Sequence, residues 1–329
     1  MFQEYIFHTI LTLFSLVLIK FRIEIANFFK IMDCPNNTRK IHLEPIPPTG
    51  GLIIFIYISA SLIYLNYGSL LSIKQLLIWL FLMSYFFIIG FIDDKKHLNA
   101  KIKTFFLIII LFIVLPLEKE LTISALRFQD LKYVIVLNQG SLFFTIFCIY
   151  FIYNALNFAD GANGVALGLC AYWIISIMII TEMNNPNYLA ILISLFLVLM
   201  SNIRNQIFTG NSGVNFLSIL FSLIFIKLFN NGHILFDQII LLVFLPSIDL
   251  VRIVVERLLN NKSPLEADQN HFQHLLIKIT GVKYVFIPYL AIATAPFLLN
   301  IFFVKSYFAL VASIAIYFMI LFFLKKKNA

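Results

Sequence analysis

The chain has 329 residues, of which 61% are hydrophobic and 12% are charged, and 37 of them are phenylalanine. An ordinary soluble domain is excluded, because such domains carry about 25% charged residues and cannot hide this much apolar surface. The net charge of +8 does not indicate nucleic-acid binding, because the basic residues are scattered over loops that flank apolar segments, as topology determinants are.

Apolar segments long enough to cross a bilayer as helices recur from end to end. We therefore predict an all-α, polytopic membrane protein, with the whole chain (1–329) forming one integral membrane domain and with a long cytoplasmic loop at 256–282. The eleven predicted transmembrane helices cover residues 6–29, 50–66, 74–92, 103–117, 134–155, 164–181, 187–203, 214–229, 235–255, 283–302 and 306–324.

The loops between these helices sort the charged residues onto one side. With an odd number of spans, 18 of the 24 lysines and arginines fall on the side of the C-terminal KKK tail. Positive charge stays cytoplasmic, so the amino terminus is predicted to face out and the carboxyl terminus in. Topology does not explain why most loop aspartates fall on the same side, whereas a site for a cation and a polyanion does.

The first cytoplasmic loop reads RKIHLEPIPPTGG at residues 39–51. Arg39 and His42 precede a rigid Pro-rich segment, and a Gly-Gly pair opens the next helix. From these residues alone, both a structural linker and a substrate-binding loop remain open.

The second loop, GFIDDKKHLNAKIK at 90–103, places Asp93 and Asp94 side by side at the end of an apolar helix. Adjacent carboxylates can hold a hard cation such as magnesium, or one of them can act as a base. Four lysines within nine residues, ending at Lys103, would suit phosphate. A solvated charged loop is the alternative.

The third segment is NALNFADGANG at 154–164. Asn154, Asn157 and Asp160 advance by about 300° per step on a helix, so all three share one face at the cytoplasmic end of a span. Asn163 follows in the glycine-bounded turn. An ordinary helix terminus with Asn and Asp turn chemistry is the alternative.

The fourth segment, TGNSGVNF at 209–216, is a glycine-bounded polar turn that opens a span. Asn211 offers an oxygen ligand, and the start of the helix offers backbone N–H groups to an anion. A simple helix cap would look the same.

The fifth segment is the long loop at 248–281. It contains Arg257 and Asp268, followed by His271 and His274 as an i, i+3 pair on a short predicted helix. No third ligand stands at a standard zinc spacing, so contact with phosphate or sugar is favoured over metal binding.

Taken in order, RKIHLEPIPPTGG, DDKKHLNAKIK, NALNFADGANG, GNSG and SPLEADQNHFQHLL resemble the polyprenyl-phosphate N-acetylhexosamine-1-phosphate transferases, glycosyltransferase family 4. The resemblance spans residues 39–276 and is closer to the branch that uses UDP-N-acetylglucosamine than to the peptidoglycan branch. It implies a bacterial inner-membrane enzyme that transfers a sugar-1-phosphate from a UDP-sugar to undecaprenyl phosphate. The reaction would release UMP and start the synthesis of a lipid-linked cell-envelope glycan, such as a cell-wall or O-antigen precursor.

The resemblance also implies roles for the residues of these segments. Catalysis would rest on Asp93, Asp94 and Asp160, and Mg²⁺ (or Mn²⁺) would be held by Asp94, Asn154, Asp160 and Asn211. Substrate contacts would come from Arg39, His42, Lys103, Asn154, Asn157, Asn163, Arg257, Asp268, His271 and His274.

Three positions depart from the family pattern. Asn163 and Asn211 stand where aspartates are usual, and Gln273 replaces a histidine. An amide oxygen can coordinate magnesium but carries no charge, so metal affinity falls. Two alternatives to an active transferase therefore stay open: an inactive relative that binds lipid phosphate, and a secondary transporter with acidic residues in its membrane helices. A homodimer packed through small residues on a span is also compatible with the sequence.

Overall fold

The computed structural model describes residues 2–35, 44–65, 71–182, 185–263 and 270–328, and most of them are helical. The chain divides into two compact units. Unit 1 comprises Met1–Leu98 and Glu182–Leu220, and unit 2 comprises Asn99–Thr181 and Phe221–Ala329. Each unit is described by itself.

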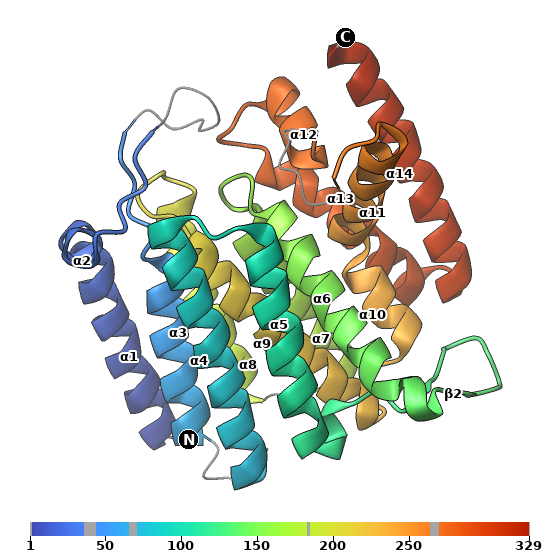
Figure 1. The fold of residues 1–329 in the computed structure, drawn as a ribbon, viewed down its shortest axis with the longest axis horizontal. Helices are drawn as coiled ribbons and strands as arrows, with labels where there is room; N and C mark the ends of the chain where they lie inside the picture. Colours follow the sequence, from blue (N-terminus) through green and yellow to red (C-terminus); the bar gives the residue numbers. More distant parts are fainter. Residues whose placement is uncertain (1, 36–43, 66–70, 183–184, 264–269, 329) are drawn as a thin grey trace. The chain divides into compact units, whose positions relative to one another are not determined.

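Unit 1 is a group of helices packed around α3. Helix α3 contacts α1, α4 and α8. Helices α1, α3 and α4 run side by side in Figure 1. The helices of this unit are α1 (Phe2–Lys20), α2 (Arg22–Phe29), α3 (Gly50–Leu65), α4 (Ile73–Lys96), α8 (Pro186–Asn202) and the start of α9 (Gly210–Asn230).

Unit 2 contains the remaining helices and a small antiparallel sheet. Strands β1 (Ala125–Leu126) and β2 (Ile135–Val136) pair with each other. The helices are α5 (Ala100–Val114), α6 (Ser141–Ala159), α7 (Val165–Thr181), the end of α9, α10 (Phe236–Leu242), α11 (Phe244–Leu259), α12 (Phe272–Thr280), α13 (Phe286–Phe302) and α14 (Ser306–Asn328), with short 3₁₀ turns η2 (Leu115–Leu117), η3 (Lys119–Leu121) and η4 (Asn138–Gly140).

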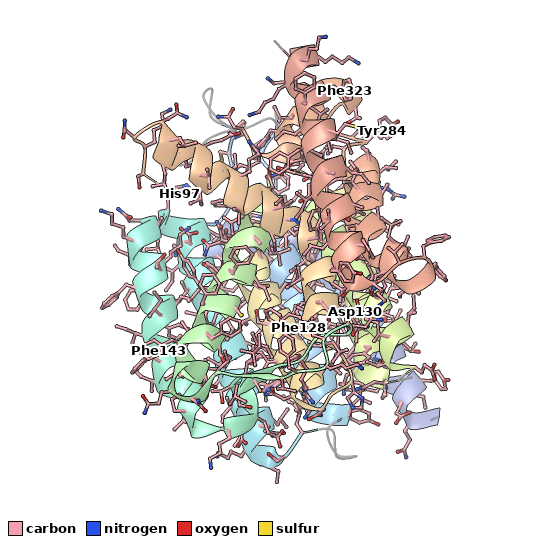
Figure 2. The ribbon with its side chains drawn as sticks, turned by 90° about the vertical axis from the view of Figure 1, so that its right-hand side faces the viewer. His97, Phe128, Asp130, Phe143, Tyr284 and Phe323 are labelled. Carbon is pink, nitrogen blue, oxygen red and sulfur yellow. The ribbon has the colours of Figure 1, made fainter. Side chains whose placement is uncertain are left out.

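The apolar faces of these helices are those of a multi-pass membrane protein. Five helices are long and apolar enough to cross a membrane, or up to seven if each of two bent pairs forms one span. Only 22% of the apolar window in α5 and 28% of that in α14 is buried in the protein, so most of each helix is left for lipid. Phe143, Tyr284 and Phe323, labelled in Figure 2, are among the exposed aromatic side chains.

Each of the eleven predicted helices corresponds to a helix or a bent pair, with one clear shift. The helix predicted at 134–155 is α6, which starts only at Ser141 because residues 135–136 form strand β2. It ends at Ala159 and therefore includes both Asn154 and Asn157. The C-terminal end of α6 matters for the site because it carries these two asparagines.

The break between α10 and α11 has a physical cause. The two helices meet at an angle of 76°, and Pro246 lies in the first turn of α11. Proline has no backbone N–H, so the carbonyl four residues earlier loses its helical partner. That carbonyl is Leu242 O, and it accepts a 2.9 Å hydrogen bond from the indole Nε1 of Trp173. A side chain of α7 thereby stabilises the bend.

Glycines allow the starts of α3 and α9 to cross in unit 1. A Cβ atom at Gly51 would lie 2.3 Å from the Cα and N atoms of Gly213, closer than any tolerated contact. The first N–H groups of α3, which have no helical partner, donate instead to the loop before α9: Gly50 N to Phe208 O at 3.0 Å and Gly51 N to Thr209 O at 2.9 Å.

A methyl group at this crossing should destabilise the protein. We expect Gly51→Ala to reduce the free energy of unfolding by about 1–3 kcal/mol, because the clash is with backbone that cannot move aside. Thermal unfolding followed by tryptophan fluorescence measures the change. Gly140→Ala is the matched control, because a Cβ there meets nothing within 4 Å and the φ angle is −76°. Equal melting temperatures for the two variants would contradict the crossing.

Candidate functional site

The predicted motifs gather into two polar clusters, one within each unit. In unit 1, residues 47–51, 90–94 and 208–213 come together; we call Asp93, Asp94, Asn211 and Ser212 the acidic cluster. In unit 2, residues 154–161 meet residues 271–274; we call Asn154, Asn157, Phe158, Asp160, Arg257, His271, Gln273 and His274 the histidine cluster.

Asp94 caps the start of α9. Its Oδ1 accepts hydrogen bonds from Asn211 N at 2.7 Å and Asn211 Nδ2 at 3.0 Å, and its Oδ2 accepts one from Ser212 N at 3.0 Å. The first N–H groups of a helix lack partners and carry the positive end of the helix dipole, so a carboxylate is stabilised there.

The approach of Asp94 requires a glycine at the start of α9. Gly210 has a φ angle of +73°, in the left-handed region that side chains disfavour. A Cβ there would also lie 2.8 Å from Asp94 Oδ2. The GNSG segment therefore binds the Asp94 carboxylate of α4. Sequence spacing did not predict this contact.

Asp93 is 3% exposed and stabilises the turn that follows α4. Its Oδ1 accepts a 2.7 Å hydrogen bond from Leu98 N, and its backbone carbonyl accepts one from His97 N. The adjacent carboxylates thus have different hydrogen-bond partners. Lys103 lies in unit 2 on α5, where its side chain is half-buried.

In unit 2, the end of α6 presents its asparagines in fixed orientations. Asn154 Nδ2 donates to Tyr150 O at 2.7 Å, and Asn157 Nδ2 donates to Tyr153 O at 2.8 Å. Because each amide nitrogen bonds to its own helix, each amide oxygen is directed away from it. Asp160 is the first residue after α6, and Asn163 lies in the following turn; both are half-buried.

Phe158 joins this segment to α12. Its carbonyl accepts a hydrogen bond from Gln273 Nε2, and its ring meets the edge of His271 with centroids 4.6 Å apart. The Arg257 guanidinium lies over the same ring at 5.4 Å. The sequence did not single out Phe158, although its position between Asn157 and Asp160 is a signal that could have done so.

His274 also belongs to this contact. A Cβ at Gly161 would lie 2.8 Å from Gln273 Nε2 and 3.0 Å from His274 Nε2, so the glycine allows α12 to approach. The predicted short helix that carries His271 and His274 is confirmed as α12, with His271 as its N-cap. Arg39, His42 and Asp268 lie outside the described residues.

The donor atoms decide which residues suit a metal ion. No group of three or more His, Cys, Asp or Glu side chains that could hold one occurs among the residues that the structure describes. Asp94 and Asn211, two of the four predicted metal ligands, are bonded to each other, with the amide nitrogen of Asn211 turned toward the carboxylate. Asp160 and Asn154 supply carboxylate and amide oxygens, the donors that magnesium prefers.

Comparison with known proteins tests the resemblance inferred from the motifs. The model of the family described as glycosyl transferase family 4 matches residues 76–229. The undecaprenyl-phosphate alpha-N-acetylglucosaminyl 1-phosphate transferase of Escherichia coli (strain K12) is 24% identical over 278 residues, which are 81% of this chain and 74% of that protein. A probable undecaprenyl-phosphate N-acetylglucosaminyl 1-phosphate transferase of Bacillus subtilis (strain 168) is 26% identical over 258 residues, 75% of this chain and 69% of that protein. The chain is therefore similar to glycosyl transferase family 4 over residues 76–229 and to these transferases over most of its length. The resemblance inferred from the motifs is confirmed.

Asn211 sets the charge of the acidic cluster. An aspartate at this position would put a second carboxylate beside Asp94 and remove the amide donor that lies 3.0 Å from it. The asparagine instead donates a hydrogen bond to Asp94 and adds no charge.

Asn211→Asp should therefore destabilise the protein when no divalent cation is present. We expect a loss of about 1–3 kcal/mol in the free energy of unfolding, because a donor to a buried carboxylate becomes a like charge. Added magnesium should recover part of this loss, since paired carboxylates bind hard cations. Melting temperatures with chelator and with magnesium measure both effects.

Asn211→Ala is the control for this experiment. It removes the amide donor without adding charge, so magnesium should leave its melting temperature unchanged. If Asn211→Asp were as stable as the parent in chelator, the hydrogen bond to Asp94 would have no energetic role.

Proposed function

We propose that this chain transfers an N-acetylhexosamine-1-phosphate from a UDP-sugar to polyprenyl (undecaprenyl) phosphate, releases UMP and thereby starts a lipid-linked cell-envelope glycan. The observation that carries the proposal is that motif residues far apart in sequence fold into two polar clusters at helix ends. They do so in a chain whose curated relatives are named as undecaprenyl-phosphate N-acetylglucosaminyl 1-phosphate transferases.

The proposed reaction is a single phosphoryl exchange. An oxygen of the lipid phosphate bonds to the β-phosphorus of the UDP-sugar, the bond from that phosphorus to the bridging oxygen breaks, and UMP leaves with that oxygen. Such transfers depend mainly on positioning and on stabilising the charge of the phosphates.

The residues of the two clusters suit these two tasks. Asp93, held by Leu98 N, would position the acceptor phosphate or accept its proton. Arg257 and Lys103 would neutralise phosphate charge, and His271 and His274 would contact the diphosphate or the sugar. Mg²⁺, when bound, would neutralise the diphosphate, and Asp160 with the amide oxygen of Asn154 would hold it.

We also propose the topology and location of the site. The five long helices, the two bent pairs and the four shorter apolar helices would make eleven spans. The distribution of 18 of 24 basic residues supports a cytoplasmic carboxyl terminus and an extracytoplasmic amino terminus in the plasma (inner) membrane. Both clusters would then lie at cytoplasmic helix ends.

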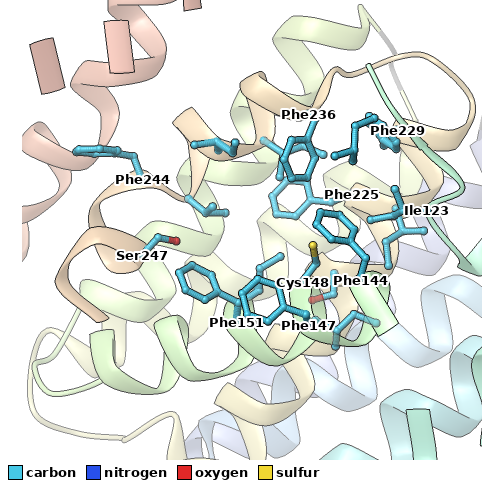
Figure 3. Close-up of a pocket in the computed structure, with 18 of the residues that line it drawn as sticks. Ile123, Phe144, Phe147, Cys148, Phe151, Phe225, Phe229, Phe236, Phe244 and Ser247 are labelled. Atoms are coloured by element: carbon cyan, nitrogen blue, oxygen red, sulfur yellow. The ribbon is translucent and has the colours of Figure 1, made fainter. Parts of the chain in front are cut away.

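The proposed acceptor needs a place for its prenyl chain, and unit 2 contains a suitable cavity. It has a volume of about 430 Å³ and an apolar lining drawn chiefly from α6, α9, α10 and α11. Figure 3 shows Phe144, Phe147 and Phe151 of α6 facing it together with Phe225 and Phe236. The bend between α10 and α11 forms part of the wall, since Val243 and Phe244 line it.

Narrowing this cavity should weaken binding of long acceptors. Cys148 lines it, so Cys148→Trp is expected to raise the KM for undecaprenyl phosphate about tenfold and leave the KM for the UDP-sugar unchanged. An acceptor with a short prenyl chain should be affected less. Phe143→Trp, on the exposed side of α6, is the control. Equal effects on long and short acceptors would remove the cavity from the proposal.

UMP release tests the reaction itself. Purified protein with magnesium and undecaprenyl phosphate is given a series of UDP-N-acetylhexosamines, and UMP is measured. We expect release with at least one donor, and Asp93→Asn should reduce the rate by about 10²–10⁴-fold because it removes the acid–base group. Asp237→Asn, an aspartate of α10 outside both clusters, is the control and should keep the parent rate. Absence of UMP release with every donor would overturn the proposed function.

A further inference from the structure

A buried ion pair in unit 2 lies beside the histidine cluster but contributes no predicted substrate contact. Arg252 Nη2 lies 2.7 Å from Asp249 Oδ1, and Arg252 Nε lies 3.1 Å from the same oxygen. Both side chains are 4% exposed. Buried ion pairs are costly to desolvate and add little stability by themselves, so this pair calls for another role.

The ion pair is hydrogen-bonded to the backbone on both sides of His271. Asp249 Oδ2 accepts a 3.0 Å hydrogen bond from Phe272 N, the first N–H group of α12. Arg252 Nη2 donates a 2.7 Å hydrogen bond to Asn270 O. The peptide groups before and after His271 are thus each bonded to one partner of a salt bridge, which fixes the direction in which His271 leaves the chain.

Helix α14 contributes a hydroxyl that bonds to both partners of the ion pair. The hydroxyl of Tyr317, on α14, donates to Asp249 Oδ1 at 2.9 Å and accepts from Arg252 Nε at 2.9 Å. Farther out, Arg252 Nη1 bonds to Glu256 Oε2 at 2.9 Å, and Glu256 Oε1 accepts from Lys325 Nζ at 2.7 Å. Lys325 is half exposed, so its ion pair contributes little.

The ring of His271 is held differently from its backbone. It is a buried side chain that packs edge-on against Phe158. Its Nδ1 lies 3.5 Å from Asp249 Oδ2 and has no hydrogen-bond partner in the described part of the chain. A buried polar atom without a partner costs free energy and calls for an explanation, and a contact between this nitrogen and the substrate is one.

We infer that Asp249, Arg252 and Tyr317 are positioning residues that hold His271 ready for the UDP-sugar by clamping the backbone on both sides of it. The inference rests on the proposed function for the identity of the ligand. Preorganisation of this kind matters because a binding group displaced by about 1 Å loses much of its effect on the rate.

Hydrogen exchange tests the clamp without reference to activity. In the full-length protein, Tyr317→Phe should accelerate amide exchange in a peptide covering residues 270–276, and Asp249→Asn should accelerate it further. Tyr172→Phe is the matched control, because it deletes another buried tyrosine hydroxyl of unit 2, and its exchange in this peptide should equal that of the parent. Unchanged exchange in Tyr317→Phe would overturn the inference.

A double-mutant cycle tests whether the clamp acts through His271. Tyr317→Phe should lower kcat/KM for the UDP-sugar about tenfold, with the KM for undecaprenyl phosphate within about twofold of the parent. In a His271→Ala background the same change should alter kcat/KM by less than about twofold, because the positioned group is gone. A purely structural role would make the two losses multiply, and that result would also overturn the inference.

The two proposals fail in distinguishable ways. If the parent releases no UMP with any donor, the proposed function is wrong, yet hydrogen exchange still decides whether the clamp exists. If the parent is active and Tyr317→Phe changes neither exchange nor kcat/KM, the clamp alone is wrong.

Discussion

The fold depends on satisfying backbone polar groups at helix ends in a protein that has little water around it. In a membrane protein an unpaired N–H or C=O group is costly, so each helix end needs a partner. Here the partners come largely from elsewhere in the chain. Asp94 of α4 caps α9, Asp249 of α11 caps α12, and the indole of Trp173 bonds to the carbonyl freed by Pro246.

This constraint links stability to the candidate site. The carboxylates at the helix ends are also those that a phosphoryl transferase would use to organise phosphates and a cation. An aspartate that accepts backbone hydrogen bonds is held in one orientation, which suits the positioning that such transfers require. Asp93 and Asp94 are held in this way by different partners. Asp93 accepts a hydrogen bond from the turn after its own helix, and Asp94 accepts one from a helix 117 residues away along the chain.

The sequence predicts local features of this protein well. Apolar length located the helices, and a spacing of three placed Asn154 and Asn157 on the last turns of α6, because both features depend on residues close together in the chain. The short helix predicted to carry His271 and His274 is α12, although His271 is its N-cap and lies just before its first residue.

Long-range features could not be predicted in this way. The pairing of Asp94 with Asn211, the role of Phe158 as the contact between two motifs, and the bonds of Tyr317 to Asp249 join residues far apart, and no periodicity encodes them. The sequence predicted Asn211 as a metal ligand that lacks the charge of the usual aspartate. In the structure it is a hydrogen-bond donor to a neighbouring acid, which gives this departure from the family pattern a physical reason.

The participation of α14 has a consequence for biosynthesis. Helices are synthesised in chain order, and Tyr317 lies in α14, which follows α6, α11 and α12 along the chain. Every residue of the histidine cluster is therefore synthesised before the hydroxyl that closes the ion pair beside it. The backbone around His271 therefore acquires this support only after α14 has been synthesised and has packed against α12.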